Sequence, residues 1–341
     1  MAFAAWLCFA VSAVAQQQTL DVYWIDVEGG AATLIVTPAG ESVLIDAGWP
    51  DERGAPRIHK VATEVARIRQ IDHLVITHFH IDHFGGAVPL SKLLPIRRVY
   101  DNGTPSPPPS DRDAAAFSEY IKTFDSIHTL LKPGDTIALR DGDGARNRSA
   151  TLRLMATRQQ VSPAASAKEN APSNATICAS AVQKAPDTSD NANSTVWVLE
   201  LGRFRFFDGG DLTWNTEARL VCPVDLVGKV DVYQANHHGM AASNNPVLVR
   251  TLAPTVTVMN NGPRKGGDAE TVAMLKGLPI EARYQVHKDV RHSENTADEL
   301  VANVPEQCGA NYIKMSVEPS GDRYTISIPA TGHSRTFKTR K

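Results

Sequence analysis

The chain has 341 residues, of which 42% are hydrophobic and 21% are charged, and its formal net charge is −2. This composition is typical of a soluble globular protein and allows one large domain or two small ones. The near-zero charge argues against a protein that binds nucleic acid by broad electrostatic attraction, so we expect no stable nucleic-acid complex.

The first fifteen residues, MAFAAWLCFAVSAVA, are apolar and lead into a polar QQQ stretch. Ala13-Val14-Ala15 is a small-x-small site of the kind that signal peptidase cleaves. A buried N-terminal helix and a membrane anchor are the alternatives, but the apolar run is short for a membrane span. We therefore predict a signal peptide at residues 1–15 and a periplasmic or secreted product that has no membrane contact after cleavage.

The ordered elements are predicted from apolar periodicity and from the Gly, Pro and Asp turns between them. In chain order they are strands 19–25, 32–37 and 42–46, helix 56–70, strand 73–77, helix 87–94, strand 97–100, helix 111–131, strands 136–139, 195–201, 204–208 and 231–235, helix 246–252 and strand 255–259. Residues 159–194 are rich in Ala, Ser, Asn and Pro, which predicts a long surface loop.

The order of these elements, strands first and then alternating strands and helices, occurs twice along the chain. Two β-rich halves, each covered by helices, predict an α/β fold with four layers, an αββα sandwich. We expect a single domain over residues 16–330 and a tail at residues 331–341.

Cleavage of the signal peptide would leave three cysteines, Cys178, Cys222 and Cys308. None of them belongs to a CxxC or a Cys/His pattern, so their spacing predicts no sulfur ligand for a metal. An oxidising compartment permits one disulfide. All three pairings stay open, and so does the alternative of three free thiols.

The most informative stretch is THFHIDHFGG, residues 77–86, at the end of an apolar strand. It places His78, His80, Asp82 and His83 within six residues, so their side chains can converge on a small volume. Imidazole and carboxylate together suit zinc, and also manganese or iron. Gly85 and Gly86 let the backbone approach closely, where a Cβ atom would crowd the site.

Two further ligand-type groups follow strands downstream. Asp211 lies in DGGD, residues 208–211, and His237 and His238 lie in NHHG, residues 236–239. Asp211 alone could equally be a helix cap or a turn residue. The repeated order of strand, ligand-type residue and Gly-rich turn favours a metal site.

These motifs resemble the metallo-β-lactamase superfamily. The resemblance rests on DVEGGA (26–31), LIDAG (44–48), the HxHxDH loop, Gly210-Asp211 and HHG (237–239), and it extends from residue 20 to about residue 330. Within the superfamily the chain is most similar to the secreted domain of bacterial DNA-uptake channel proteins (ComEC-like) and to phosphorylcholine esterase. The resemblance implies a metallo-β-lactamase-like hydrolase domain over residues 16–330.

The resemblance also implies a ligand set for up to two Zn²⁺ ions per chain, with Mn or Fe as alternatives. His78 and His80 would hold the first metal, Asp82 and His83 the second, and Asp211 would bridge the two. One of His237 and His238 would complete the second site; we favour His238 as the ligand and His237 as a polar group facing the substrate. Asp46 matches an acid that orients the His loop without touching metal.

Many family members supply one more first-site histidine between the HxHxDH loop and the bridging Asp. His128 is the only histidine between residues 84 and 210, and we interpret it as structural or exposed because it lies in a predicted helix. Asp101, after a predicted strand, is an alternative ligand. His287 and His292 lack metal spacing, and we assign neither a role.

Arg264 and Lys265 lie in a Gly-rich turn after a strand, where they form a candidate site for an anionic substrate. The alternative is a solvated basic turn. The resemblance implies a hydrolase in which a metal-activated hydroxide attacks the substrate and Asp82 relays its proton. We expect a phosphodiester or phosphoester substrate. A β-lactam, a lactone or another carboxylic ester or amide comes next, and a non-catalytic metal- or ligand-binding protein comes third.

Overall fold

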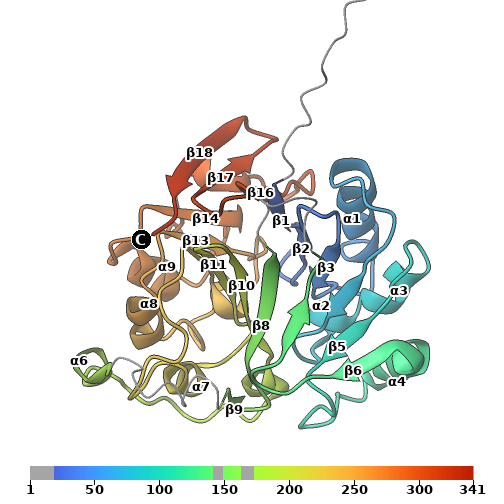
Figure 1. Ribbon diagram of the computed structural model, residues 1–341, viewed down its shortest axis with the longest axis horizontal. Helices are drawn as coiled ribbons and strands as arrows, with labels where there is room; N and C mark the ends of the chain where they lie inside the picture. Colours follow the sequence, from blue (N-terminus) through green and yellow to red (C-terminus); the bar gives the residue numbers. More distant parts are fainter. Residues whose placement is uncertain (1–18, 141–148, 163–172, 341) are drawn as a thin grey trace, which may run out of the picture.

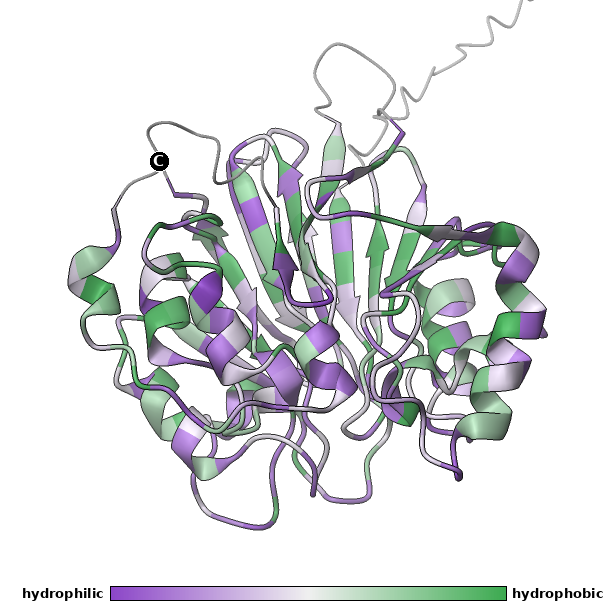
Figure 2. Ribbon diagram, turned by 90° about the horizontal axis from the view of Figure 1, so that it is seen from below, coloured by the Kyte–Doolittle hydropathy of each residue, from purple (hydrophilic) through white to green (hydrophobic). Residues whose placement is uncertain are grey.

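The computed structural model describes residues 19–140, 149–162 and 173–340. Two sheets pack face to face at its centre, and helices cover the outer face of each sheet (Figures 1 and 2). The chain therefore has the mixed α/β fold with four layers that the sequence predicts. The expected signal peptide at residues 1–15 lies outside the described residues.

The first sheet combines the N-terminal strands with the C-terminal ones, so both ends of the described chain meet in it (Figure 1). Its strand order is β18 (His333–Lys338), β17 (Arg323–Ile328), β16 (Ile313–Val317), β1 (Leu20–Trp24), β2 (Thr33–Val36), β3 (Ser42–Ile45), β4 (His73–Val75), β5 (Val99–Asp101) and β6 (His128–Leu130). Strands β3 to β6 are parallel, whereas β16, β1, β2 and β3 pair in antiparallel fashion.

The second sheet is formed by the middle of the chain. Its strand order is β15 (Val301–Asn303), β14 (Ala282–His287), β13 (Val256–Met259), β12 (Val232–Gln234), β11 (Phe204–Asp208), β10 (Val196–Leu201), β8 (Ala150–Thr157) and β7 (Thr136–Ala138), and β9 (Gln160–Val161) pairs with β8. Strands β11 to β15 are parallel. Parallel strands place their carboxyl ends at one edge of the sheet, and this is where the ligand-type residues follow.

Short helices and helical turns connect these strands. They are α1 (Ala55–Lys60), the π-helical turn η1 (Val61–Val65), α2 (Ile81–Phe84), α3 (Ala87–Ser91), α4 (Ala114–Phe124), η2 (Asp125–Ile127), α6 (Ala175–Cys178), η3 (Asp190–Asn193), α7 (Trp214–Arg219), η4 (Asn236–Gly239), α8 (Pro246–Leu252), α9 (Ala269–Lys276) and η5 (Asp298–Leu300). No helix in the described ranges is long and apolar enough to cross a membrane.

The alternation of side chains along β1 shows how the layers are held together. Leu20, Val22 and Trp24 point into the core between the two sheets, whereas Tyr23 packs into the core beneath α1, α3 and α4. A strand with period two can supply both cores at once because successive side chains leave opposite faces. A third core lies between the second sheet and helices α7, α8 and α9.

Three sequence expectations differ from the structure. The predicted helix 111–131 is shorter, because α4 ends at Phe124 and residues from His128 form β6, which extends the parallel edge of the first sheet. The expected tail contains β18, which pairs with β17 along its whole length. The expected loop 159–194 contains β9, α6 and η3 in its described part. Tertiary pairing that the local sequence does not encode explains each difference.

A disulfide links Cys178, at the end of α6, to Cys222, which follows α7. It attaches the segment that carries α6 to the helical layer of the second sheet. Cys308 is free and half-buried. The structure thus selects one of the three pairings that the sequence left open.

Candidate metal centre

The ligand-type residues meet at the seam between the two sheets. The HxHxDH residues follow β4 of the first sheet, Asp211 follows β11 of the second, and His237 and His238 follow β12. In each case the segment leaves the carboxyl end of a buried strand, so residues distant in sequence arrive at one edge of the sandwich. The structure brings together the six ligands predicted from the sequence.

Four buried side chains form the first group: Asp82, His83, Asp211 and His238. The Nε2 atom of His83 lies 3.1 Å from Asp211 Oδ2 and 3.3 Å from Asp82 Oδ2. The Nε2 atom of His238 lies 3.2 Å from Asp82 Oδ2 and 3.5 Å from Asp211 Oδ1. The side chain that points into this group is therefore His238, as the sequence analysis favours.

His78, His80 and Asp211 form a second group that shares Asp211 with the first. The Nε2 atom of His78 lies 3.0 Å from Nδ1 of His80 and 3.8 Å from Asp211 Oδ2. Because Asp211 belongs to both groups, its carboxylate occupies the position that a bridging ligand needs. The first group offers four ligand atoms and the second only three.

Asp46 orients ligands of this centre through hydrogen bonds to His83 and Thr77. Its Oδ2 accepts hydrogen bonds from His83 Nδ1 at 2.7 Å and from the Thr77 hydroxyl at 2.8 Å, and its Oδ1 accepts from the Thr77 backbone N–H at 2.8 Å. Because the Thr77 hydroxyl donates to Asp46, it accepts from His78 Nδ1, which lies 3.1 Å away. Both imidazoles are thereby held with Nε2 directed into the centre.

The backbone around His238 is unusual. His237 and His238 both have φ of 54°, in the left-handed region that side-chain-bearing residues rarely adopt. Gly266 packs against this turn so closely that a Cβ atom on it would lie 2.2 Å from the His238 carbonyl oxygen. On the other side, a Cβ atom on Gly86 would lie 2.0 Å from the Ala47 carbonyl oxygen, which confirms the close backbone approach expected there.

The charges in this buried volume require a cation. Burial alone would raise the pKa of Asp82 and of Asp211, but His83 and other nearby positive groups outweigh it and hold both pKa values well below the usual range. Burial likewise opposes protonation of His83, yet Asp211, Asp82 and Asp46 raise its pKa well above the usual value. Asp211 and Asp82 also raise the pKa of His238 against the effect of burial, so three carboxylates share the Lys265 ammonium group and the protons of His83 and His238.

A divalent transition metal fits this set of donors. It would replace the proton on His83 and compensate the carboxylates, and nitrogen and oxygen donors suit Zn²⁺, Mn²⁺ or Fe²⁺. His78, His80 and Asp211 would hold one ion, and Asp82, His83, Asp211 and His238 would hold the other. No sulfur atom belongs to either group.

His237 lies at the rim of the centre. Its Nε2 is 3.5 Å from Asp211 Oδ2 and accepts a hydrogen bond from Asn191 Nδ2 at 3.4 Å, and its Nδ1 is 3.3 Å from the Ser243 hydroxyl. Because Asn191 Nδ2 can only donate, His237 carries its proton on Nδ1. Burial lowers the pKa of His237, so the imidazole is neutral at pH 7.

The structure separates the two residues of the predicted anion site. The Lys265 ammonium forms an ion pair with Asp82 and lies 4.9 Å from the centroid of the Trp49 ring. Arg264 points away, pairs with Glu306 on the surface, and its side chain is 65% exposed. The prediction for Arg264 is wrong because adjacent residues in this turn project to opposite sides.

His128 and Asp101 form a pair of their own. His128 Nε2 lies 2.9 Å from Asp101 Oδ1, and the other oxygen of Asp101 accepts from the Tyr120 hydroxyl at 3.0 Å. Neither residue belongs to a group of converging ligand atoms among the described residues. The structural interpretation of His128 therefore stands, although the residue lies in a strand and not in a helix.

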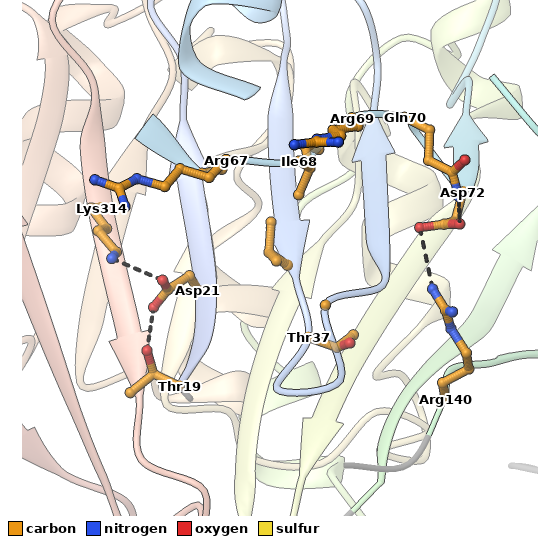
Figure 3. Close-up of a pocket in the computed structure, with 13 residues that line it drawn as sticks. Thr19, Asp21, Thr37, Arg67, Ile68, Arg69, Gln70, Asp72, Arg140 and Lys314 are labelled. Atoms are coloured by element: carbon orange, nitrogen blue, oxygen red, sulfur yellow. Dashed lines mark hydrogen bonds and ion pairs between the residues drawn. The ribbon is translucent and has the colours of Figure 1, made fainter. Parts of the chain in front are cut away.

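A hollow of about 780 Å³ lies at the opposite end of the same strands. Figure 3 shows that Arg67 and Arg69 extend over the sheet there, while Lys314 pairs with Asp21 and Arg140 with Asp72. Thr19 precedes β1, and Arg67, Arg69 and Asp72 precede β4, whereas the HxHxDH residues follow β4. This hollow is therefore remote from the centre, and we assign it no part in catalysis.

A comparison with protein families matches the part of the chain that contains the HxHxDH loop. Residues 25–146 match the family model of the metallo-beta-lactamase superfamily. This match supports the superfamily that the motifs indicate. The sandwich of two sheets is consistent with the fold of that superfamily.

Two curated proteins and one solved structure are similar to the chain. A UPF0173 metal-dependent hydrolase of Rubrobacter xylanophilus is 33% identical over 64 residues, 19% of this chain and 24% of that protein. Another from Koribacter versatilis is 33% identical over 75 residues, 22% of this chain and 28% of that protein. The chain thus matches about a quarter of each relative's length. The structure of YhfI from Bacillus subtilis, a metallo-beta-lactamase fold protein, has a TM-score of 0.45 at 11% identity, covering 78% of this chain and 95% of that one.

Proposed function

We propose that the protein is a metal-dependent hydrolase that acts on a phosphodiester or phosphoester. The observation that carries the hydrolase proposal is the shared position of Asp211 between two groups of buried ligand atoms. The family match and the names of the two relatives support it. We further propose zinc as the metal, because imidazole and carboxylate donors in compact groups suit it.

When bound, the metals supply an activated water and stabilise negative charge on the substrate. The chain's own groups move the protons. The Asp82 carboxylate lies in the first group, with His83, Asp211 and His238, and stays ionised, so it can accept a proton from the attacking water. His237 is neutral and only partly buried at the rim, with Nε2 as an acceptor, so it can exchange a proton with the substrate or leaving group.

The phosphoester preference rests on Lys265. Its ammonium lies at Asp82, beside the metal-type groups, and its aliphatic part packs against Gly29. A cation at this position stabilises the negative charge that builds up on phosphoryl oxygens, and it does so more strongly in a partly dry site than in water. The resemblance to the DNA-uptake domain and to phosphorylcholine esterase supports the same substrate class.

A carbonyl substrate is the second candidate. The same centre can direct an attack on a β-lactam, a lactone or another ester or amide, and Trp49 beside Lys265 offers an apolar surface for a neutral substrate. The two substrate classes differ in charge, so Lys265 is the residue that separates them.

We also propose that the protein acts outside the cytoplasm. The Cys178–Cys222 disulfide supports this location, because disulfides persist in oxidising compartments and are rare in the cytosol. The apolar stretch before Gln16 supports it independently.

A substrate panel tests the proposed activity. The zinc-loaded protein should hydrolyse a simple aryl phosphodiester with kcat/KM at least about tenfold above that for a lactone or a β-lactam, a difference of about 1.4 kcal/mol. Chelation of the metal should abolish turnover, and zinc should restore it. Higher turnover of the lactone or the lactam would contradict the phosphoester proposal, and no turnover of any substrate at full metal content would contradict the hydrolase proposal.

A further inference from the structure

A second set of ligand-type side chains lies on the far side of the loop that carries Lys265. Asp26 follows β1, His287 ends β14, and Cys308 lies between β15 and β16. Asp26 and His287 are buried, and Cys308 is half-buried. The loop residue Asn261 donates from its side chain to the His287 carbonyl oxygen at 2.8 Å. The loop therefore borders this cluster as well as the metal centre described above, called the His-Asp centre from here on, which comprises His78, His80, Asp82, His83, Asp211 and His238.

The three side chains converge on a single point. Cys308 Sγ lies 2.9 Å from Asp26 Oδ2, and His287 Nε2 lies 3.2 Å from the same oxygen. The sulfur, nitrogen and oxygen atoms all lie within 4.8 Å of one another. The residues come from both sheets, and Asp26 and His287 are separated by more than 250 positions in the sequence. No local spacing in the sequence therefore reveals the cluster.

We propose that Asp26, His287 and Cys308 form a separate site for one divalent transition-metal ion of the zinc type. Thiolate, imidazole and carboxylate are all established zinc ligands, and bond lengths of roughly 2.0–2.3 Å place such ligand atoms roughly 3.3–3.5 Å apart around a tetrahedral ion. The two separations from Asp26 Oδ2, 2.9 Å to Cys308 Sγ and 3.2 Å to His287 Nε2, are slightly shorter than these values, so a small outward movement of the Cys308 and His287 side chains would admit the ion. Because Cys308 is half-exposed, water can supply the fourth ligand.

The neighbouring charges suit a divalent ion. Arg57 Nη1 lies 3.1 Å from Asp26 Oδ2 and 4.0 Å from Cys308 Sγ, and its Nη2 pairs with Glu28 Oε1 at 2.5 Å, so the Glu28 carboxylate offsets the charge of this guanidinium. The Asp26 carboxylate and the Cys308 thiolate then neutralise a divalent cation. The ion binds as the Cys308 thiol and His287 Nε2 give up the protons that they donate to Asp26, both of which pass to solvent, and no oxidation or reduction takes place. The sulfur ligand distinguishes this site from the His-Asp centre, whose donors are nitrogen and oxygen only.

A metal at this position would link the two sheets close to the His-Asp centre. Asp26 begins the segment that continues through Gly29, which packs on Lys265, to Ala31, whose N–H donates to the Asp82 carbonyl oxygen at 3.1 Å. Fixing Asp26 to His287 and Cys308 therefore stabilises a segment that borders the His-Asp centre. The proposal does not depend on the hydrolase activity, because metal binding can be measured without substrate.

Cobalt substitution provides the test. The exported protein, which we expect to begin at Gln16 and so to lack Cys8, is stripped of metal with its disulfide intact and titrated with Co²⁺ while its near-ultraviolet absorption is recorded. A thiolate bound to Co²⁺ gives an intense charge-transfer band that imidazole and carboxylate ligands do not give. We expect this band to report one bound Co²⁺ in addition to the ions held by the His-Asp centre, and to be absent in Cys308→Ser. The Asp211→Ala variant, altered only in the His-Asp centre, should keep the band.

Two further variants make the outcome decisive. His287→Ala should weaken the Co²⁺ affinity reported by the band by about tenfold or more. Removal of a ligand should reduce metal affinity at least as much as removal of a residue that only hydrogen-bonds to a ligand. His292→Ala is the matched control, because His292 belongs to no group of converging ligand atoms among the described residues, and it should leave the band unchanged. Absence of the band in the wild-type protein, its survival in Cys308→Ser, or unchanged affinity in His287→Ala would each overturn the site.

Discussion

Asp46 and His83 are joined by a 2.7 Å hydrogen bond between carboxylate Oδ2 and imidazole Nδ1, and both side chains are buried. This contact fixes the rotation of the His83 ring and leaves Nε2 directed at Asp82 and Asp211. Asp46 itself is held in the left-handed region, with φ of 61°, by its bonds to Thr77. An acid that touches none of the other ligands thus determines how one of them points.

Replacing this acid by its amide should weaken metal binding without removing a ligand. In Asp46→Asn the side chain can no longer accept from both Thr77 and His83, so the ring loses its orientation. We expect the affinity for zinc to fall by about 10–100-fold, measured by competition with a chromophoric chelator. Asp101→Asn is the matched control, because Asp101 holds His128 instead of a ligand. Equal affinities in Asp46→Asn and wild type would show that Asp46 does not orient the centre.

Removal of the bridging carboxylate should have a larger effect. Asp211→Ala takes a ligand from both groups at once, so we expect the metal content of the His-Asp centre to fall from two ions toward none, with turnover falling in parallel. Elemental analysis in a Cys308→Ser background, which excludes the ion proposed at Asp26, His287 and Cys308, measures the first quantity. His128→Ala should leave both unchanged. Full metal content in Asp211→Ala would exclude the bridge, and loss of one ion in His128→Ala would identify a missed ligand.

The sequence predicts this centre well because its ligands follow strands. His78, His80, Asp82 and His83 are local in the sequence, and each later ligand comes directly after an apolar run that can only be a buried strand. The order of strands and helices likewise predicts the four layers. The sequence therefore predicts the strands and layers that position the centre.

The sequence could not predict features that depend on distant pairing. His128 has helical neighbours, yet it joins β6 because the parallel edge beside β5 is open to it. Arg264 and Lys265 are adjacent in the sequence, yet only the backbone of the turn decides that one meets Glu306 and the other Asp82. The cluster of Asp26, His287 and Cys308 needs three segments to meet, and no local period encodes that meeting.

The pair formed by His128 and Asp101 should make stability depend on pH. The hydrogen bond to Asp101 is the main cause that raises the pKa of His128 above its ordinary value of about 6.5. A raised folded-state pKa means that this stabilisation is fully present below about pH 6.5 and is lost as the pH rises through the folded value. Since the His128 side chain is 32% exposed, we expect no more than about 1 kcal/mol.

Urea unfolding of the wild type and of His128→Ala measures this contribution. The free energy of unfolding should differ between the two proteins at pH 6, and the difference should shrink at pH 9. A difference that stays the same at both values would mean that His128 contributes by packing and not through its charge.

The expected export gives a prediction about both the N-terminus and the disulfide. Protein recovered from the periplasm or medium should begin at Gln16, as read by N-terminal sequencing, and should lack free thiols at Cys178 and Cys222. Protein made in a reducing cytosol should contain these thiols and unfold at a lower temperature, because closing the loop of 44 residues restricts the unfolded chain. A mature protein that still begins at Met1 would contradict cleavage.

The choice between a charged and a neutral substrate depends on the ammonium group of Lys265. Lys265→Met keeps the aliphatic part that packs on Gly29 and removes only the charge. If the ammonium stabilises phosphoryl oxygens, its removal should cost about 2 kcal/mol of transition-state stabilisation, roughly a thirtyfold loss of kcat/KM for a phosphodiester. The loss for a neutral lactone should be much smaller. Assays at saturating zinc separate this effect from any change in metal affinity that follows from the contact with Asp82.

Arg264→Ala is the internal control, because its guanidinium pairs with Glu306 at the surface and the turn itself stays intact. We expect kcat/KM for both substrates to stay within about twofold of wild type in this variant, the range of a neutral surface change. Equal losses of kcat/KM for the phosphodiester and the lactone in Lys265→Met would mean that Lys265 only holds the Asp82 side chain in place. No loss on either substrate would leave the ammonium without a part in the reaction, and the phosphoester preference would then rest on the resemblance alone.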